Sequence, residues 1–117
     1  MTSKTIKYRW YTDSGHAWLR VSKHVCNQLG ILDRISGFSY QSRQGTYLYL
    51  EEDCDAGLFL QAVKDKQLPC HMLPTRYEDR SRVRHLPNYM AGIKQLKQDK
   101  LLDAAIEAGI LHIKVIR

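Results

Sequence analysis

The residues most suggestive of chemistry are four carboxylates between two apolar runs, in the stretch YLYLEEDCDAGLFL. Such a cluster suits three roles: a calcium loop, a catalytic acid and base, or the start of a helix. Calcium loops need a glycine at the sixth position and a distal glutamate. Counted from Asp53, Gly57 is fifth, and Lys64 stands where the distal carboxylate is required. The calcium interpretation therefore fails, and a catalytic pair needs a partner that spacing does not show.

Helix capping explains the acidic cluster best. Asp53 or Asp55 is placed to cap a helix, and the other carboxylates favour the positive end of its dipole. The apolar residues of that helix follow at helical spacing: Leu58, Phe59, Ala62 and Val63. We therefore expect the cluster to be structural, and we expect neither a metal nor a cofactor.

A second cluster is rich in arginine. The segment TRYEDRSRVRHLP, residues 75–87, has charge but no sustained period, which predicts an exposed basic loop. Arginine presents a planar fork of donors that suits phosphates and carboxylates. The predicted binding residues are this loop's arginines and three later lysines: Arg76, Arg80, Arg82, Arg84, Lys94, Lys97 and Lys100.

The same segment offers an enzymatic alternative centred on His85. A histidine or Tyr77 that moves a proton, beside arginines that hold a phosphate, is the equipment of a small metal-independent ribonuclease. No second acid or base is placed opposite His85 by the sequence, and a solvated loop explains the same residues.

The three cysteines, Cys26, Cys54 and Cys70, are an odd number without a close pair. This usage is typical of reduced thiols that serve as small buried hydrophobes, and we expect Cys54 to be buried near a helix start. His24 and His71 lie beside two of the thiols, but the closely spaced pairs of structural zinc sites are absent.

Aromatic residues recur on predicted strands, and they allow two interpretations. They either stack on nucleobases across a sheet face, with Lys7, Arg9, Arg20 and Arg43 near the phosphates, or fill the core between sheet and helices. The glycine and aromatic spacing of the RNA-recognition signature is absent. The residues concerned are Tyr8, Trp10, Phe38, Tyr40, Tyr47 and Tyr49.

Two consecutive ββα units are expected to position these groups. Alternating residues on both sides of Asp13-Ser14-Gly15 predict a hairpin, and a short helix follows from Ser22 to its C-terminal Gly30. The same order recurs with strands around Tyr40 and over 46–51, then a helix that ends near Lys66. Beyond it we expect a strand over 70–73, helices beginning near Asn88 and Asp99, and a closing strand over 111–116.

These elements predict an α+β fold, a single domain over 1–117 with a mostly antiparallel sheet of five to six strands and helices mainly on one face. The composition, 44% hydrophobic and 26% charged, is that of a globular protein. There is neither a membrane-spanning apolar run nor a signal peptide, so we expect a cytoplasmic protein without membrane partners.

The formal net charge of +6 is unevenly distributed, because residues 51–75 carry two basic and five acidic side chains. A basic chain with one acidic patch is consistent with binding a polyanion or an acidic protein surface, and equally with ordinary solubility.

The segments WLRVSKHVCNQLGILDRISGFSY and YLYLEEDCDAGLFL, about Trp18 to Leu60, resemble small uncharacterised proteins and domains of proteobacterial plasmids and phages. The resemblance implies an accessory protein of a mobile element, a class that includes inhibitors of host restriction and CRISPR systems. It brings no catalytic motif and assigns no functional residue.

Together these observations favour a non-enzymatic accessory protein that binds host nucleic acid or a nucleoprotein complex, in an anti-defence role. The alternatives are the ribonuclease centred on His85 and a structural module that pairs through an exposed strand edge.

Overall fold

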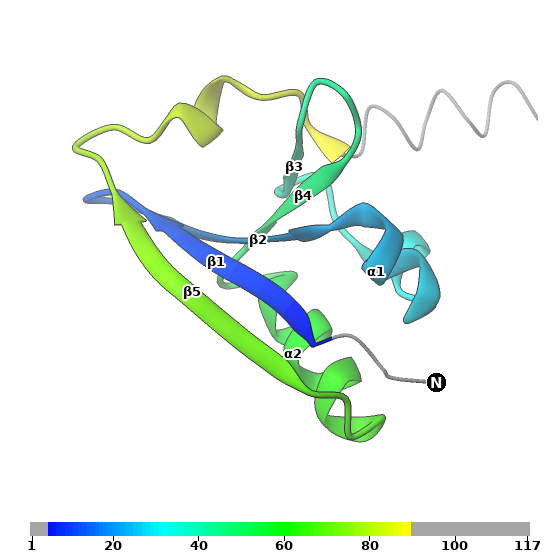
Figure 1. The fold of residues 1–117 in the computed structure, drawn as a ribbon. Helices are drawn as coiled ribbons and strands as arrows, with labels where there is room; N and C mark the ends of the chain where they lie inside the picture. Colours follow the sequence, from blue (N-terminus) through cyan, green and yellow to red (C-terminus); the bar gives the residue numbers. More distant parts are fainter. Residues whose placement is uncertain (1–4, 90–117) are drawn as a thin grey trace, which may run out of the picture.

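The computed structural model describes residues 5–89. Several predictions therefore lie outside the described residues. They are the helix expected to begin near Asn88, apart from its first two positions, the helix near Asp99, and the closing strand over 111–116. The predicted binding residues Lys94, Lys97 and Lys100 lie outside them as well. The described part has an α+β fold, which confirms the predicted class (Figure 1).

Five strands form one mixed sheet in the order β3-β4-β2-β1-β5. Three neighbouring pairs are antiparallel, and β5 runs parallel to β1. Parallel neighbours need a crossover connection, and the helix between β4 and β5 supplies it. The strand bounds are β1 Ile6–Thr12, β2 Ala17–Ser22, β3 Tyr40–Gln41, β4 Tyr47–Glu51 and β5 Cys70–Tyr77.

Two α-helices and two short 3-10 helices complete the described chain. Their bounds are α1 Lys23–Gln28, η1 Leu32–Arg34, α2 Ala56–Asp65 and η2 Arg82–His85. As expected, α1 ends before Gly30, whose φ of +73° is the left-handed conformation that glycine adopts without strain. The Ile31 N–H donates to the Cys26 carbonyl and closes the helix end.

The core lies between one face of the sheet and α2. Alternate residues of β2 and β4 are buried against the helix, as the period-two pattern predicts. Tyr8 and Trp10 point to this face, and Tyr8 meets Phe59 edge to face at 5.8 Å. The central buried residues are Leu19, Val21, Leu48, Leu50, Phe59 and Val63.

The most buried carboxylate of the acidic cluster, Asp55, is structural, but its contacts differ from those of a cap. Asp55 occupies the N-cap position of α2, yet its side chain accepts no hydrogen bond from the helix. Its carboxylate instead accepts from the Ser36 N–H, the Ser36 hydroxyl and the Ser39 hydroxyl. Asp55 is buried and ties the loop before β3 to the start of α2, so the capping prediction is wrong for this side chain.

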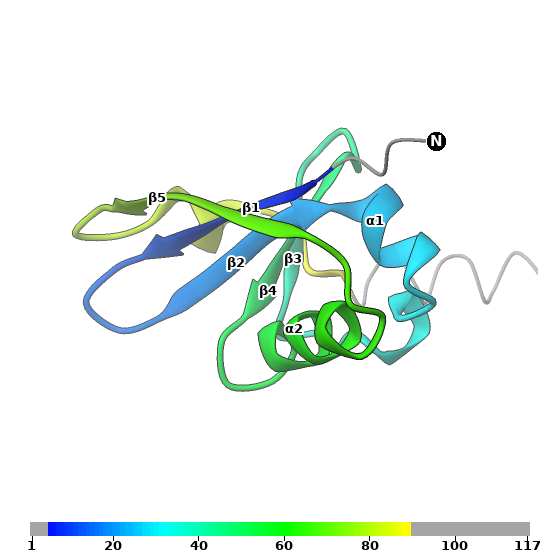
Figure 2. The same cartoon turned by 60° about the horizontal axis from the view of Figure 1, so that its bottom comes forward.

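The segment expected to be an exposed loop, 75–87, is structured at two places. Residues 75–77 belong to β5, and 82–85 form η2. Ser81 and Val83 are buried, and the Ser81 hydroxyl accepts from the Val83 N–H as an N-cap. This segment therefore folds back over the sheet, on the side opposite α2 (Figures 1 and 2).

Candidate ligand-binding face of the sheet

The face of the sheet turned away from α2 carries arginines and tyrosines where the other face carries the core. Because side chains alternate along a strand, Arg9 and Tyr11 of β1 share this open face with Arg20 of β2 and Tyr49 of β4. Cross-strand pairing places Arg9 opposite Arg20, and Arg20 opposite Tyr49. The register thus builds a row of cationic and aromatic groups across three strands.

Helix η2 lies across this open face and divides it. On one side, Arg82, Val83 and Leu86 border a cavity over β1, β2 and β5. On the other side, Arg84 borders a smaller recess over β2, β3 and β4. Trp18 is buried and lines the recess, with the Arg84 guanidinium 5.3 Å from the centroid of its ring.

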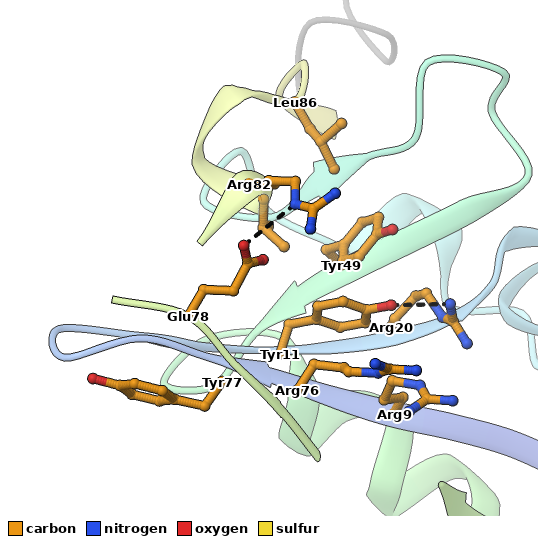
Figure 3. Close-up of a pocket in the computed structure, with 10 residues that line it drawn as sticks. Arg9, Tyr11, Arg20, Tyr49, Arg76, Tyr77, Glu78, Arg82 and Leu86 are labelled. Carbon is orange, nitrogen blue, oxygen red and sulfur yellow. Dashed lines mark hydrogen bonds and ion pairs between the residues drawn. The ribbon is translucent and has the colours of Figure 1, made fainter. Parts of the chain in front are cut away.

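The larger space, here termed the cationic cavity, has a volume of about 600 Å³, within the usual range for ligand sites. Four arginines face a single carboxylate in it, and the rings of Tyr11 and Tyr49 supply the aromatic surface. Figure 3 shows the polar groups of Arg9, Arg20 and Arg76 extending in the same direction from their strands. The lining residues are Arg9, Tyr11, Arg20, Tyr49, Arg76, Tyr77, Glu78, Arg82, Val83 and Leu86.

Arg20 is held in place by aromatic rings. Its NH1 donates to the Tyr11 hydroxyl at 3.1 Å, and its guanidinium lies 4.7 Å from the ring centroid of Tyr47 and 5.6 Å from that of Tyr11. Tyr11 and Tyr49 meet edge to face at 5.4 Å. A guanidinium stacked in this way keeps most of its donors for a ligand.

The other three arginines are lightly engaged. Arg9 NH1 donates to the Pro74 carbonyl at 2.8 Å, and Arg76 is exposed. Arg82 meets Glu78 at 3.3 Å, but the Arg82 side chain is 90% exposed, and ion pairs in such solvated positions hold their partners weakly. The cavity therefore presents a net positive charge to an approaching anion.

Tyr49 adds a neutral donor to this cationic surface. Burial is the main cause that raises the pKa of its phenol, and Tyr11 and Tyr47 add to the rise while Arg20 opposes it. The phenol consequently keeps its proton at neutral pH, so it does not repel a phosphate.

The predicted binding residues are only partly brought together. Arg76 and Arg82 line the cationic cavity, whereas Arg80 is exposed and does not line it. Arg84 turns to the other side of η2, where Asp13 holds it. Arg9 and Arg20 belong to the alternative interpretation, in which strand aromatics stack on bases. Tyr11 was predicted neither as a binding residue nor as a stacking residue, although its alternation with Lys7 and Arg9 indicates that it shares their face.

The hypotheses of metal and thiol chemistry find little support in the residues that the structure describes. No group of three or more metal-ligating side chains occurs among residues 5–89. Cys26 is buried, which raises its pKa to about 12, whereas Cys54 and Cys70 are exposed. The expectation of a buried Cys54 is therefore wrong, because the turn before α2 faces solvent. His85 is exposed and lines neither space, and its carbonyl accepts from Arg43 NH2.

Comparison of the chain with protein-family models, with curated proteins and with solved structures found no match. Over residues 5–89, every helix is too short or too polar to span a bilayer.

Proposed function

We propose that this protein binds single-stranded nucleic acid on the open face of its sheet. The observation that carries the proposal is the cationic cavity, where four arginines lie with the rings of Tyr11 and Tyr49 and one carboxylate. Single-strand binding sites combine a positive groove for the phosphates with aromatic rings on which the bases stack.

The arrangement favours a single strand over a duplex. Exposed rings reach bases only when these are unpaired, and Tyr47, which shares the open face of β4 with Tyr49 and lies beside Arg20, is 39% exposed. From β4 to β5 the face covers three strand spacings, about 14 Å. Four-stranded sheets of this width stack two or three bases in other RNA-binding modules.

This activity fits the role that the sequence resemblance implies. We propose that the protein acts without catalysis, as an accessory protein of a mobile element that engages host nucleic acid or a nucleoprotein complex in an anti-defence role. Electrostatic attraction would bring the partner to the sheet, and the rigid strands would hold the rings in register. The compartment consistent with this role is the cytoplasm.

Equilibrium binding to labelled oligonucleotides tests the proposal. Fluorescence anisotropy with single-stranded DNA, single-stranded RNA and a matched duplex should show saturable binding to at least one single strand, with weaker binding to the duplex. A chain that binds none of them, or binds the duplex more tightly, contradicts the proposal. Incubation of each labelled strand without metal also tests the ribonuclease alternative, because that alternative requires cleavage that His85→Ala abolishes.

A further inference from the structure

The smaller space on the open face, here termed the acidic recess, has a different chemistry from the cationic cavity. Its volume is about 270 Å³, and it lies at the end of the sheet where β2, β3 and β4 meet the turn before α2. Aromatic rings form its walls and carboxylates lie beside them. The lining residues are His16, Trp18, Phe38, Tyr40, Glu51, Asp53, Cys54 and Arg84.

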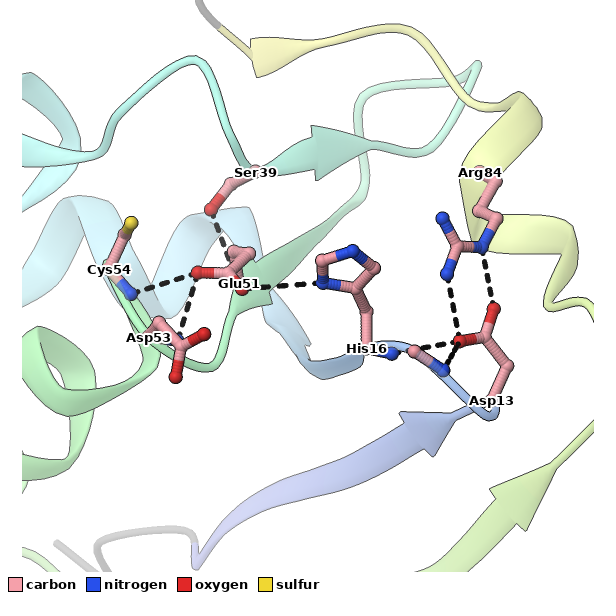
Figure 4. A network of polar contacts seen from close by, with 8 residues as sticks. Asp13, His16, Ser39, Glu51, Asp53, Cys54 and Arg84 are labelled. Atoms are coloured by element: carbon pink, nitrogen blue, oxygen red, sulfur yellow. Dashed lines mark hydrogen bonds and ion pairs between the residues drawn. The ribbon is translucent and has the colours of Figure 1, made fainter.

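Part of this recess already holds a cation of the chain itself. The Arg84 guanidinium stacks over Trp18 and donates to both carboxylate oxygens of Asp13, at 2.6 Å and 2.9 Å (Figure 4). The Asp13 side chain is only 1% exposed, so this arginine is fully neutralised. The rest of the recess has no arginine or lysine among its lining residues.

Glu51 is oriented toward that remaining space. Its side chain is nine-tenths buried, and Oε2 accepts from the N–H groups of Asp53 and Cys54, both at 2.9 Å. The other oxygen, Oε1, accepts no hydrogen bond from residues 5–89, and His16 Nδ1 lies 3.9 Å from it. A carboxylate that backbone donors hold in place, and whose second oxygen has no protein donor and reaches solvent, is a strong acceptor for a ligand.

Two neighbouring side chains complete a site for a flat cation. Phe38 is 69% exposed, the highest value among the large hydrophobic residues of the described chain, and its ring borders the recess. Asp53 is exposed and forms no ion pair among residues 5–89. The negative surroundings also act on Cys54, because the Glu51 carboxylate, with help from burial, raises the pKa of this thiol.

We infer that the acidic recess binds the guanidinium group of an arginine presented by a protein partner. Arginine fits better than lysine, because its planar, weakly hydrated group stacks on a ring while its forked donors reach carboxylates. Phosphates are repelled by Glu51 and Asp53, so this site is separate from the nucleic-acid face. The inference does not rest on the proposed function, although a nucleoprotein would offer both ligands side by side.

Nuclear magnetic resonance titration of the full chain with N-acetyl-arginine amide tests the inference. The backbone amides of Asp53 and Cys54 and the Trp18 indole N–H should shift saturably, and the uncharged N-acetyl-citrulline amide should leave them in place. Asp53→Asn should weaken binding about tenfold, since one charge-assisted hydrogen bond is lost. Glu52→Gln is the matched control, because it removes the same charge from an exposed neighbour and should change the affinity less than twofold.

Phe38→Ala provides a second variant that leaves the core intact, since the ring is exposed, and it should weaken binding roughly threefold. Equal shifts with arginine and citrulline amides, or equal losses in Asp53→Asn and Glu52→Gln, would overturn the inference. Titration with guanosine monophosphate tests whether the recess binds nucleotides instead. If the same amides report a higher affinity for guanosine monophosphate than for arginine amide, the recess is a nucleotide site and the inference is wrong.

Discussion

Arg84 Nε donates to Asp13 Oδ2 at 2.6 Å, across 71 residues of chain, and this pair joins η2 to the turn between β1 and β2. The same carboxylate accepts from the N–H groups of Gly15, His16 and Ser81. The strand hairpin and the segment that covers the open face are thus fixed to each other through one buried side chain. Both the cationic cavity and the acidic recess depend on this attachment, because η2 forms a wall of each.

Stability should depend on pH through Asp13. The Arg84 guanidinium, together with the backbone N–H groups, holds the pKa of this carboxyl well below its ordinary value of 3.8. A depressed pKa gives stability that is fully present above 3.8 and is lost as the pH falls toward the folded-state value. The free energy of unfolding of the wild type should therefore exceed that of Asp13→Asn by a constant amount from pH 5 to 7. The difference should shrink below pH 4 in urea unfolding monitored by circular dichroism, and a difference that grows in acid would contradict this role.

Asp55→Ala should destabilise the protein by about 2 kcal/mol, because the buried Ser39 hydroxyl and the half-buried donors of Ser36 lose their acceptor. Asp53→Ala is the matched control. It removes a carboxylate two residues away that is exposed, so the free energy of unfolding should change by no more than about 0.5 kcal/mol. Equal effects of the two variants in chemical denaturation would show that Asp55 does not tie the loop to α2.

Thiol reagents should distinguish the three cysteines. In the native protein two thiols, Cys54 and Cys70, should react with a disulfide reagent at pH 8, while Cys26 should react only after unfolding. Glu51→Gln should speed the reaction of Cys54, because the carboxylate that raises its pKa is removed. The absorbance change gives both the number of reactive thiols and their rates. If three thiols reacted rapidly in the native protein, Cys26 would lie outside the core.

Tyr47→Ala should weaken single-strand binding by about 1–3 kcal/mol, the contribution of one stacked base. Tyr47 is exposed, so the free energy of unfolding should hardly change. Phe38→Ala is an informative control, because it removes another exposed ring that borders the acidic recess instead. Oligonucleotide anisotropy should respond to the first substitution only, and an equal loss in both would argue against a defined stacking face.

Local patterns predicted the elements better than their assembly. The alternation on both sides of Asp13 and the left-handed Gly30 gave the hairpin and the end of α1, because both signals act within a few residues. Alternation also divides the strands into two faces. Alternation does not show which face the helices cover, so the sequence alone leaves the strand aromatics divided between core and binding surface. In the structure Tyr8 and Trp10 pack on the helix side.

The misjudged parts depend on contacts between distant residues. The 75–87 segment has no period of its own and is ordered by Asp13, which no local pattern indicates. In the same way, Asp55 occupies the N-cap position of α2, but its carboxylate accepts hydrogen bonds from Ser36 and Ser39 instead. The sequence therefore predicted only part of the candidate site. Arg76 and Arg82 were expected to bind, but the sheet register is needed to show that Arg9 and Arg20 lie beside them.

The salt dependence of single-strand binding tests the central claim most directly. Each phosphate contact contributes about 0.7 to the slope of log affinity against log salt concentration. The double variant Arg9→Gln/Arg76→Gln should therefore lower that slope by about 1.4 and weaken binding across sequences. Lys64→Gln/Lys66→Gln removes the same charge from exposed positions at α2, on the other side of the sheet, and should leave the slope near that of the wild type. An unchanged slope in the arginine variant, or an equal decrease in both variants, would contradict the assignment of nucleic-acid binding to the cationic cavity.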